Sequence, residues 1–173
     1  MKRTHVAKGA KPIVVEPREQ DVRPGHKPKG FWYEVNGDWR RWCETDMPEY
    51  IEGGFLHTVT LGRERVRRIK GVHDFDLFDA KYGAREWAPG YSERYGPMSL
   101  GIRWADVAED WDGVEIAPYL WNRRLGGPSW YYTWDCASGV IWRPDGITVT
   151  YSEPIRSVTR SVTADWSGVG QSG

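Results

Sequence analysis

The chain has few cysteines, no net charge and no long apolar run, and each of these absences excludes a class of protein. Its two cysteines, Cys43 and Cys136, form no CxxC pair and have no histidine at zinc-site spacing, so we expect no metal and leave open whether the thiols are free. Basic and acidic residues number 24 each, so no overall field draws the protein toward nucleic acid or a membrane surface. No run approaches the roughly 18 apolar residues of a membrane span, and no charged-then-apolar signal segment opens the chain. The sequence therefore predicts a soluble, cytoplasmic protein without a membrane partner.

Nucleotide-binding and hydrolase signatures are missing as well. The chain contains no GxGxxG, no GxxxxGK[ST] and no GxSxG, which weighs against a Rossmann dehydrogenase, a P-loop ATPase and an α/β-hydrolase. Its 173 residues suffice for one domain with a hydrophobic core of its own. We expect that domain to cover residues 1–153, with 1–30 as an extended, proline-rich segment and 154–173 as a flexible tail.

What the chain has in excess is tryptophan, with eleven residues that stand mostly beside charged or glycine positions. The densest such stretch, 111–119, places Glu115 in a strand-like Val-Glu-Ile step among several aromatic rings. Rings around one acid are what a pocket for a flat, charged ligand needs. The plainer interpretation is that these rings belong to the hydrophobic core.

The apolar pattern predicts an α+β fold with an antiparallel or mixed sheet and a few short helices, because strands gather toward both ends of the chain with helices between them. Residues 84–101, rich in glycine and proline, are expected to form a loop. The helix over 103–111 has the clearest periodicity, with Trp104, Val107, Ala108 and Trp111 on one face. The expected helices are 38–46, 74–82 and 103–111, and the expected strands are 4–7, 13–15, 31–35, 55–61, 66–69, 114–116, 130–134, 140–143 and 147–151.

Three segments together resemble small bacteriophage and bacterial ADP-ribosyltransferase-like proteins: Arg-Thr-His-Val at 3–6, Lys-Pro-Lys-Gly-Phe-Trp-Tyr at 27–33 and Trp-Asp-Gly-Val-Glu-Ile at 111–116. The phrase at 130–142 is similar to the closing strands of such proteins. The resemblance implies a split pair of antiparallel sheets that holds NAD. It also implies an enzyme that transfers ADP-ribose from NAD to a macromolecular target, without a metal.

The family's His-Tyr-Glu pattern implies a role for each matching residue of this chain. His5 would donate a hydrogen bond to the ribose on the adenosine side, Tyr33 or Trp32 would be the ring beside nicotinamide, and Glu115 would be the catalytic carboxylate. Cleaving the bond between nicotinamide and ribose develops positive charge on the sugar, which a fixed carboxylate stabilises. No general acid is needed, because nicotinamide leaves as a neutral molecule.

The sequence departs from the family pattern in two places. Glu34 follows Tyr33 where a small hydroxyl residue often stands, which leaves the choice of ring open, and Asp135 is a rival for the carboxylate role. Plainer roles stay open too: a structural histidine at His5, a core ring at Trp32 or Tyr33, and a turn-capping Asp135.

Arginines near such a pocket, with Arg123 and Arg124 the best placed, would bind the pyrophosphate in bidentate fashion. The leading hypothesis is an NAD-dependent ADP-ribosyltransferase with an unidentified acceptor, more readily a protein than a nucleic acid. If it is phage-encoded, it would act in the host cytoplasm, in host takeover or against host defence. The alternative is a phage-type protein-binding inhibitor without enzymatic activity that uses exposed Trp, Tyr and Arg residues. Single-stranded nucleic-acid binding is a third option that lacks the usual basic excess.

Overall fold

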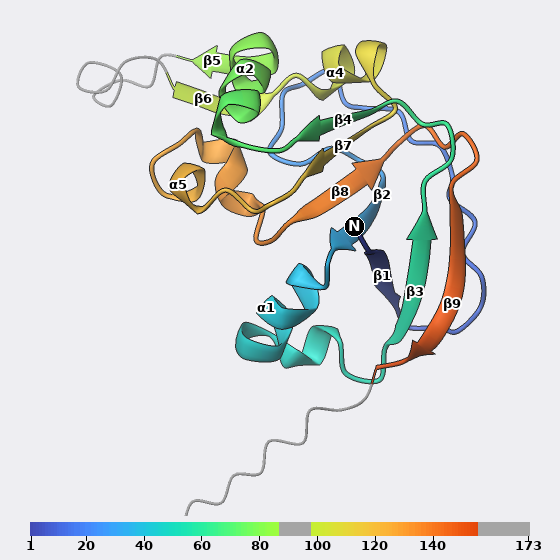
Figure 1. Cartoon of the computed structure of the whole chain (residues 1–173). Helices are drawn as coiled ribbons and strands as arrows, with labels where there is room; N and C mark the ends of the chain where they lie inside the picture. The colour runs from blue at the N-terminus through green and yellow to red at the C-terminus, as the bar shows by residue number, and fades with distance from the viewer. Residues whose placement is uncertain (87–97, 156–173) are drawn as a thin grey trace, which may run out of the picture.

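The fold is built on a seven-stranded sheet in a computed structural model that describes residues 1–86 and 98–155. The strand order is β4-β7-β8-β2-β1-β3-β9, and each neighbouring pair is antiparallel except β4 with β7 (Figure 1). The strands are β1 (Arg3–Ala7), β2 (Phe31–Val35), β3 (Phe55–Thr60), β4 (Val66–Ile69), β7 (Gly113–Ile116), β8 (Ser138–Ile141) and β9 (Thr148–Pro154), and a separate hairpin pairs β5 (Gly83–Glu86) with β6 (Met98–Ile102). The predicted α+β class with a mostly antiparallel sheet is confirmed.

The helices are short and lie between strands. They are α1 (Asp38–Asp46), α2 (Val72–Tyr82), α4 (Trp104–Asp110) and α5 (Trp121–Arg124), with 3-10 helices η1 (Pro48–Tyr50) and η2 (Ser129–Thr133). The predicted helices 38–46, 74–82 and 103–111 are confirmed to within two residues at each end. α1 follows a tight turn in which Asn36 and Gly37 both have positive φ, of 56° and 76°, as the Asn-Gly pair predicts.

The sheet divides between its two central strands. Backbone pairing of β1 with β2 is confined to Arg3 with Val35 and Thr4 with Glu34. Residues 5–7 of β1 pair with β3, whereas residues 31–34 of β2 pair with β8. In Figure 1, β1, β3 and β9 form one group and β4, β7 and β8 another. The two groups therefore share only a short ladder and diverge at His5.

Most of the buried aromatic side chains pack as one core on the helical side of the sheet. Phe75 of α2 stacks on Trp130 of η2 with ring centroids 5.2 Å apart, and Trp104 of α4 meets Trp130 edge-on at 6.2 Å. The same cluster contains the strand residues Val114, Ile116 and Val140. Among the tryptophans of the described residues, Trp104, Trp130, Trp134 and Trp142 are buried in this core.

Three of the predicted elements are wrong, and one of them is the strand expected at 13–15. Residues 129–133 form the 3-10 helix η2 instead of a strand, because Trp130, Tyr131 and Trp134 are buried together while Tyr132 is exposed, which is a helical and not an alternating pattern. Residues 84–86 and 98–101 belong to the β5–β6 hairpin instead of a loop, and residues 87–97 lie outside the described part of the chain.

The N-terminal segment after β1 runs across the sheet without a strand at 13–15. Its backbone is fixed at Arg18, whose N–H donates to the carbonyl of Trp142 at 2.8 Å, and at Gly25, which exchanges two hydrogen bonds with Ile102. Residues 8–30 contain no helix and no strand, apart from an isolated β-bridge at Gly25. The predicted flexible tail falls almost entirely on residues 156–173, which lie outside the described residues.

Candidate functional site

A half-open cavity of about 300 Å³ lies where β1 and β2 diverge. Its volume is at the lower end of the range for small-molecule sites. Strands β1 and β2, helix α1 and the segment that precedes β8 all contribute to its wall. The lining residues are Thr4, His5, Val6, Lys27, Trp32, Tyr33, Glu34, Trp39, Trp134, Asp135, Cys136 and Ser138. His5, Trp32, Tyr33 and Asp135, four of the seven predicted site residues, are thereby brought to one place.

Three indole rings give the cavity its apolar surface. Trp32 and Trp134 meet edge to face with ring centroids 4.9 Å apart, and Trp39 comes from the first turn of α1. The ammonium group of Lys27 lies 5.5 Å from the ring of Trp32, a cation–π distance. The cavity therefore offers flat apolar surfaces with a positive charge at one side.

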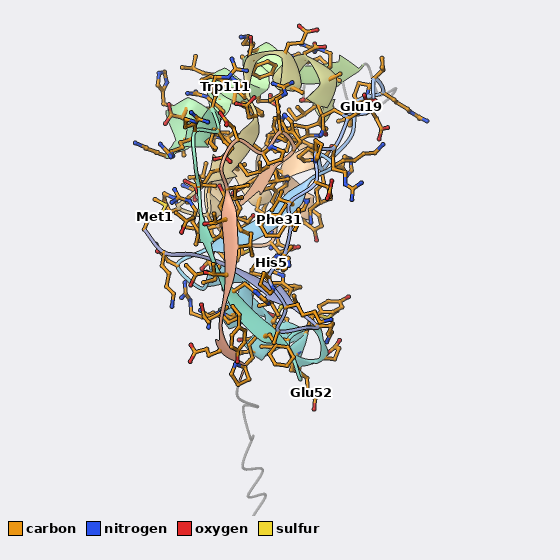
Figure 2. The ribbon with its side chains drawn as sticks, turned by 90° about the vertical axis from the view of Figure 1, so that its right-hand side faces the viewer. Met1, His5, Glu19, Phe31, Glu52 and Trp111 are labelled. Atoms are coloured by element: carbon orange, nitrogen blue, oxygen red, sulfur yellow. The ribbon has the colours of Figure 1, made fainter. Side chains whose placement is uncertain are left out.

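His5 stands at the point of divergence and bridges the two strands. Its Nδ1 lies 2.7 Å from the carbonyl oxygen of Trp32, and its ring lies against Phe31 at 4.6 Å (Figure 2). A carbonyl only accepts hydrogen bonds, so Nδ1 carries the proton and Nε2 is left as an acceptor. Burial holds the pKa of His5 below its ordinary value, against the opposing effect of the Trp32 carbonyl. His5 is accordingly neutral at physiological pH.

Two carboxylates line the cavity, and they are held very differently. Glu34 is buried, and it accepts hydrogen bonds from the hydroxyl of Thr4 at 2.5 Å and from the Nε and backbone N–H of Arg40 at 2.7 and 3.0 Å. Asp135 keeps 31% of its side-chain surface exposed and lies 3.4 Å from Nη2 of Arg124. Glu34 is thus fixed as part of the wall, whereas Asp135 is the carboxylate that a ligand can reach.

The cysteines do not supply a nucleophile. Both thiols are free and buried, which resolves the question that the sequence left open. Burial raises the pKa of Cys136, in the cavity wall, to about 12 and that of Cys43, in α1, to about 11. Neither forms a thiolate near neutral pH, and the thiolate is the reactive species.

Glu115 lies away from the cavity, on the opposite face of the sheet. It is 2% exposed and accepts hydrogen bonds from Nε of Arg3 at 2.5 Å and from the hydroxyl of Tyr33 at 3.0 Å. The guanidinium of Arg68 lies 3.7 Å from the same carboxylate. Tyr33, the ring expected beside nicotinamide, thus directs its hydroxyl to Glu115, and Trp32 is the indole of β2 that lines the cavity. The catalytic role expected of Glu115 stays a prediction, and Glu115 is not among the residues that line this cavity.

Of the two predicted arginines, only Arg124 adjoins the cavity. It pairs with Asp135 and lies 5.8 Å from the ring of Trp121 and 5.2 Å from that of Tyr132. Arg123 forms a bidentate pair with Asp76 of α2, at 2.8 and 2.6 Å. Four arginines earlier in the chain, between residues 63 and 68, are also paired with acidic residues. The pairs are Arg63 with Asp145, Arg65 with Asp112, Arg67 with Asp74 and Arg68 with Glu115.

Lys27, Trp39 and Trp134 line the cavity but are not among the predicted site residues. The signal for Trp134 was its position beside Asp135, and Trp39 follows the Asn-Gly turn that starts α1. α1 is brought to the cavity by Asp38, whose Oδ2 accepts the backbone N–H of Ala137 at 2.7 Å. That contact joins residues 99 positions apart and has no signal in the local sequence.

Comparisons with protein-family models, with curated proteins and with solved structures find no match for the chain. Within residues 1–86 and 98–155, no three His, Cys, Asp or Glu side chains gather as metal ligands. The described helices include none that is long and apolar enough to cross a membrane. The function is therefore inferred from the cavity itself.

Proposed function

We propose that the chain is an NAD-dependent ADP-ribosyltransferase that binds the nicotinamide-ribose part of NAD in the cavity between β1 and β2. The observation that carries the proposal is the convergence of His5, Trp32 and Asp135, from three distant segments, on one aromatic cavity. The divergence of the sheet at this point agrees with the split sheets that the family resemblance implies. About 300 Å³ suits part of a dinucleotide, so the adenosine half would extend along the surface.

Asp135 is the carboxylate assigned to the reaction. The bond between nicotinamide nitrogen and the ribose carbon breaks, its electron pair leaves with nicotinamide, and positive charge develops on the sugar. A carboxylate fixed beside the ribose stabilises that charge more than it stabilises the ground state, in which the positive charge lies on the nicotinamide ring. The acceptor's nucleophile then bonds to the same carbon and loses its proton. Asp135 suits this role because its side chain is 31% exposed, whereas Glu34 and Glu115 are buried and bonded within the protein.

The other side chains would bind and orient NAD. The rings of Trp32, Trp39 and Trp134 offer faces and edges to nicotinamide, at roughly 0.5–1.5 kcal/mol per aromatic pair beyond the buried area. Nε2 of His5 would accept a hydrogen bond from a ribose hydroxyl, instead of donating one as the resemblance implies, because Nδ1 carries the proton. Arg124, which lies beside Asp135, would meet the pyrophosphate, whereas the guanidinium of Arg123 forms a bidentate pair with Asp76.

Thermal unfolding with and without NAD tests the proposal. NAD at about 100 times its dissociation constant adds roughly 2.7 kcal/mol to the stability of the protein. Trp32→Ala should abolish this stabilisation, whereas Tyr50→Ala, at a 51% exposed ring outside the cavity, should leave it intact. Absence of any NAD-dependent stabilisation in the unsubstituted protein would contradict the proposal.

A second candidate is a protein-binding module, and one surface favours it. Trp121, Tyr132 and Leu125 are 62%, 56% and 82% exposed, and Arg124 lies beside both rings. Exposed Trp, Tyr and Arg dominate the energetics of protein interfaces. Loss of partner binding in Trp121→Ala and Tyr132→Ala, together with no response of the protein to NAD, would favour this function over the transferase.

A further inference from the structure

We infer that Glu115 is a positioning residue for the cavity: from the opposite face of the sheet it ties Arg3 of β1 and Tyr33 of β2 together and so fixes the strands that carry the binding residues. This inference rests on the proposed function of the cavity. It also gives Glu115 a role that its burial allows, since its carboxylate is 2% exposed and bonded within the protein.

The bridge crosses an intervening strand through a glycine. Tyr33 of β2 is paired with Gly139 of β8, and Gly139 is in turn paired with Glu115 of β7. A Cβ atom at position 139 would collide with the ring and hydroxyl of Tyr33. The absence of a side chain at Gly139 therefore lets the tyrosine lie across β8 and place its hydroxyl 3.0 Å from the carboxylate of Glu115.

Each anchor of the bridge is next in sequence to a residue of the cavity wall, and Tyr33, whose hydroxyl points to Glu115, also borders the cavity itself. Adjacent residues in a strand point to opposite faces of the sheet. Arg3 is followed by Thr4, Tyr33 lies between Trp32 and Glu34, and Gly139 follows Ser138. Thr4, Trp32, Glu34 and Ser138 all line the cavity. A displacement of the anchors on one face consequently displaces the binding residues on the other.

The bridge joins β1 and β2, the two neighbouring strands that share only two backbone-paired positions. The ladder between β1 and β2 ends at Thr4 with Glu34, beside the cavity. Arg3 is paired with Glu115 at 2.5 Å in a partly buried site, so the interaction is little screened by solvent. Glu115 thus adds a side-chain connection between β1 and β2 beside the point where their short backbone ladder ends.

The test compares Glu115→Gln with Asp112→Asn as a matched control. Asp112 is also a buried, arginine-paired carboxylate, with Arg143 at 2.7 Å and Arg65 at 3.3 Å, but it does not line the cavity or contact Tyr33. A milder variant, Tyr33→Phe, removes only the hydroxyl and remains informative if Glu115→Gln fails to fold. We would measure KM and kcat for nicotinamide release. Separately, without NAD, we would record the fluorine NMR spectrum of protein labelled with 5-fluorotryptophan.

Glu115→Gln and Tyr33→Phe should each raise the KM for NAD by on the order of tenfold, a change of about 1.4 kcal/mol in binding, while kcat changes far less. Both should shift the indole resonances of Trp32 and Trp134, and Asp112→Asn should do neither. Equal effects in all three variants, or a kcat loss with an unchanged KM, would overturn the inference. If the unsubstituted protein does not turn over NAD, the proposed function fails, and the resonances alone decide whether Glu115 positions the cavity.

Discussion

At the scale of residues, the site is defined by how tightly each carboxylate is held. Glu34 receives three hydrogen bonds and Glu115 is bonded to an arginine and a tyrosine, so both are occupied within the protein. Asp135 has a long 3.4 Å contact with Arg124 and keeps about a third of its surface free. A carboxylate that must meet developing charge on a ligand has to be accessible, and this criterion separates Asp135 from its neighbours.

Asp135→Asn keeps the shape of the side chain and removes its charge. Nicotinamide release should fall by about 10²–10³-fold, the usual cost of losing one electrostatic stabiliser, while NAD still raises the melting temperature. Nicotinamide release and NAD-dependent melting, measured on one preparation, check both halves of this prediction. Full turnover by the variant would remove Asp135 from the chemistry.

At the scale of elements, α4 contributes Trp104 to the aromatic core and packs it against Trp130 of η2. Trp104 is buried, and its indole N–H donates to the carbonyl of Gly25 at 2.9 Å while its ring contacts Trp130. Trp104→Ala should lower the free energy of unfolding by about 3–5 kcal/mol. Urea denaturation measures this change, with Glu109→Ala on the exposed side of the same helix as the control. Equal midpoints for the two variants would contradict the core role of α4.

The junction of β2, β8 and β7 depends on a position without a side chain. Gly139→Ala forces a methyl group against the ring of Tyr33, and overpacking of this kind costs about 1–3 kcal/mol. The same substitution at Gly9, where an added Cβ meets nothing within 4 Å, should have little effect. Denaturation midpoints of the two alanine variants, compared with the unsubstituted protein, measure the difference. A stable Gly139→Ala protein would show that Tyr33 can leave the bridge without cost.

Local patterns in the sequence predict the elements better than they predict the site. The amphipathic spacing in 103–111 and the Asn-Gly turn before α1 are properties of a few neighbouring residues, and the structure confirms both. The apolar run at 130–134 fits a strand or a buried helix equally well, which is why η2 was missed. The contact of Glu115 with Tyr33 could not be predicted from the sequence, because it depends on the register of β7, β8 and β2. A register across three strands is a long-range property that no local pattern specifies.

At the scale of the whole molecule, many of the acidic and basic residues pair with one another within the described fold. The arginines of 63–68 pair with acids from other elements, and Arg3 and Arg40 neutralise the buried carboxylates of Glu115 and Glu34. These pairs leave little unbalanced charge to attract a polyanion. The short ladder between β1 and β2 joins the two groups of strands, and His5 follows directly after its last paired residue, Thr4.

His5 makes the stability of this junction depend on pH. The pKa of His5 is held below its ordinary 6.5, first by burial and further by the neighbouring His57, although the Trp32 carbonyl and Glu34 act in the opposite direction. Between the lowered folded pKa and 6.5 the unfolded chain binds a proton that the folded protein does not, so stability falls as the pH drops below about 6.5 and is unaffected above it. Urea midpoints measured from about pH 7.5 down to about pH 5.5 should decline, and His5→Gln, which can still donate to the Trp32 carbonyl, should flatten that decline. An equally steep decline in His5→Gln would assign the proton to another group, and the neutral, bridging His5 at the mouth of the cavity would lose its support.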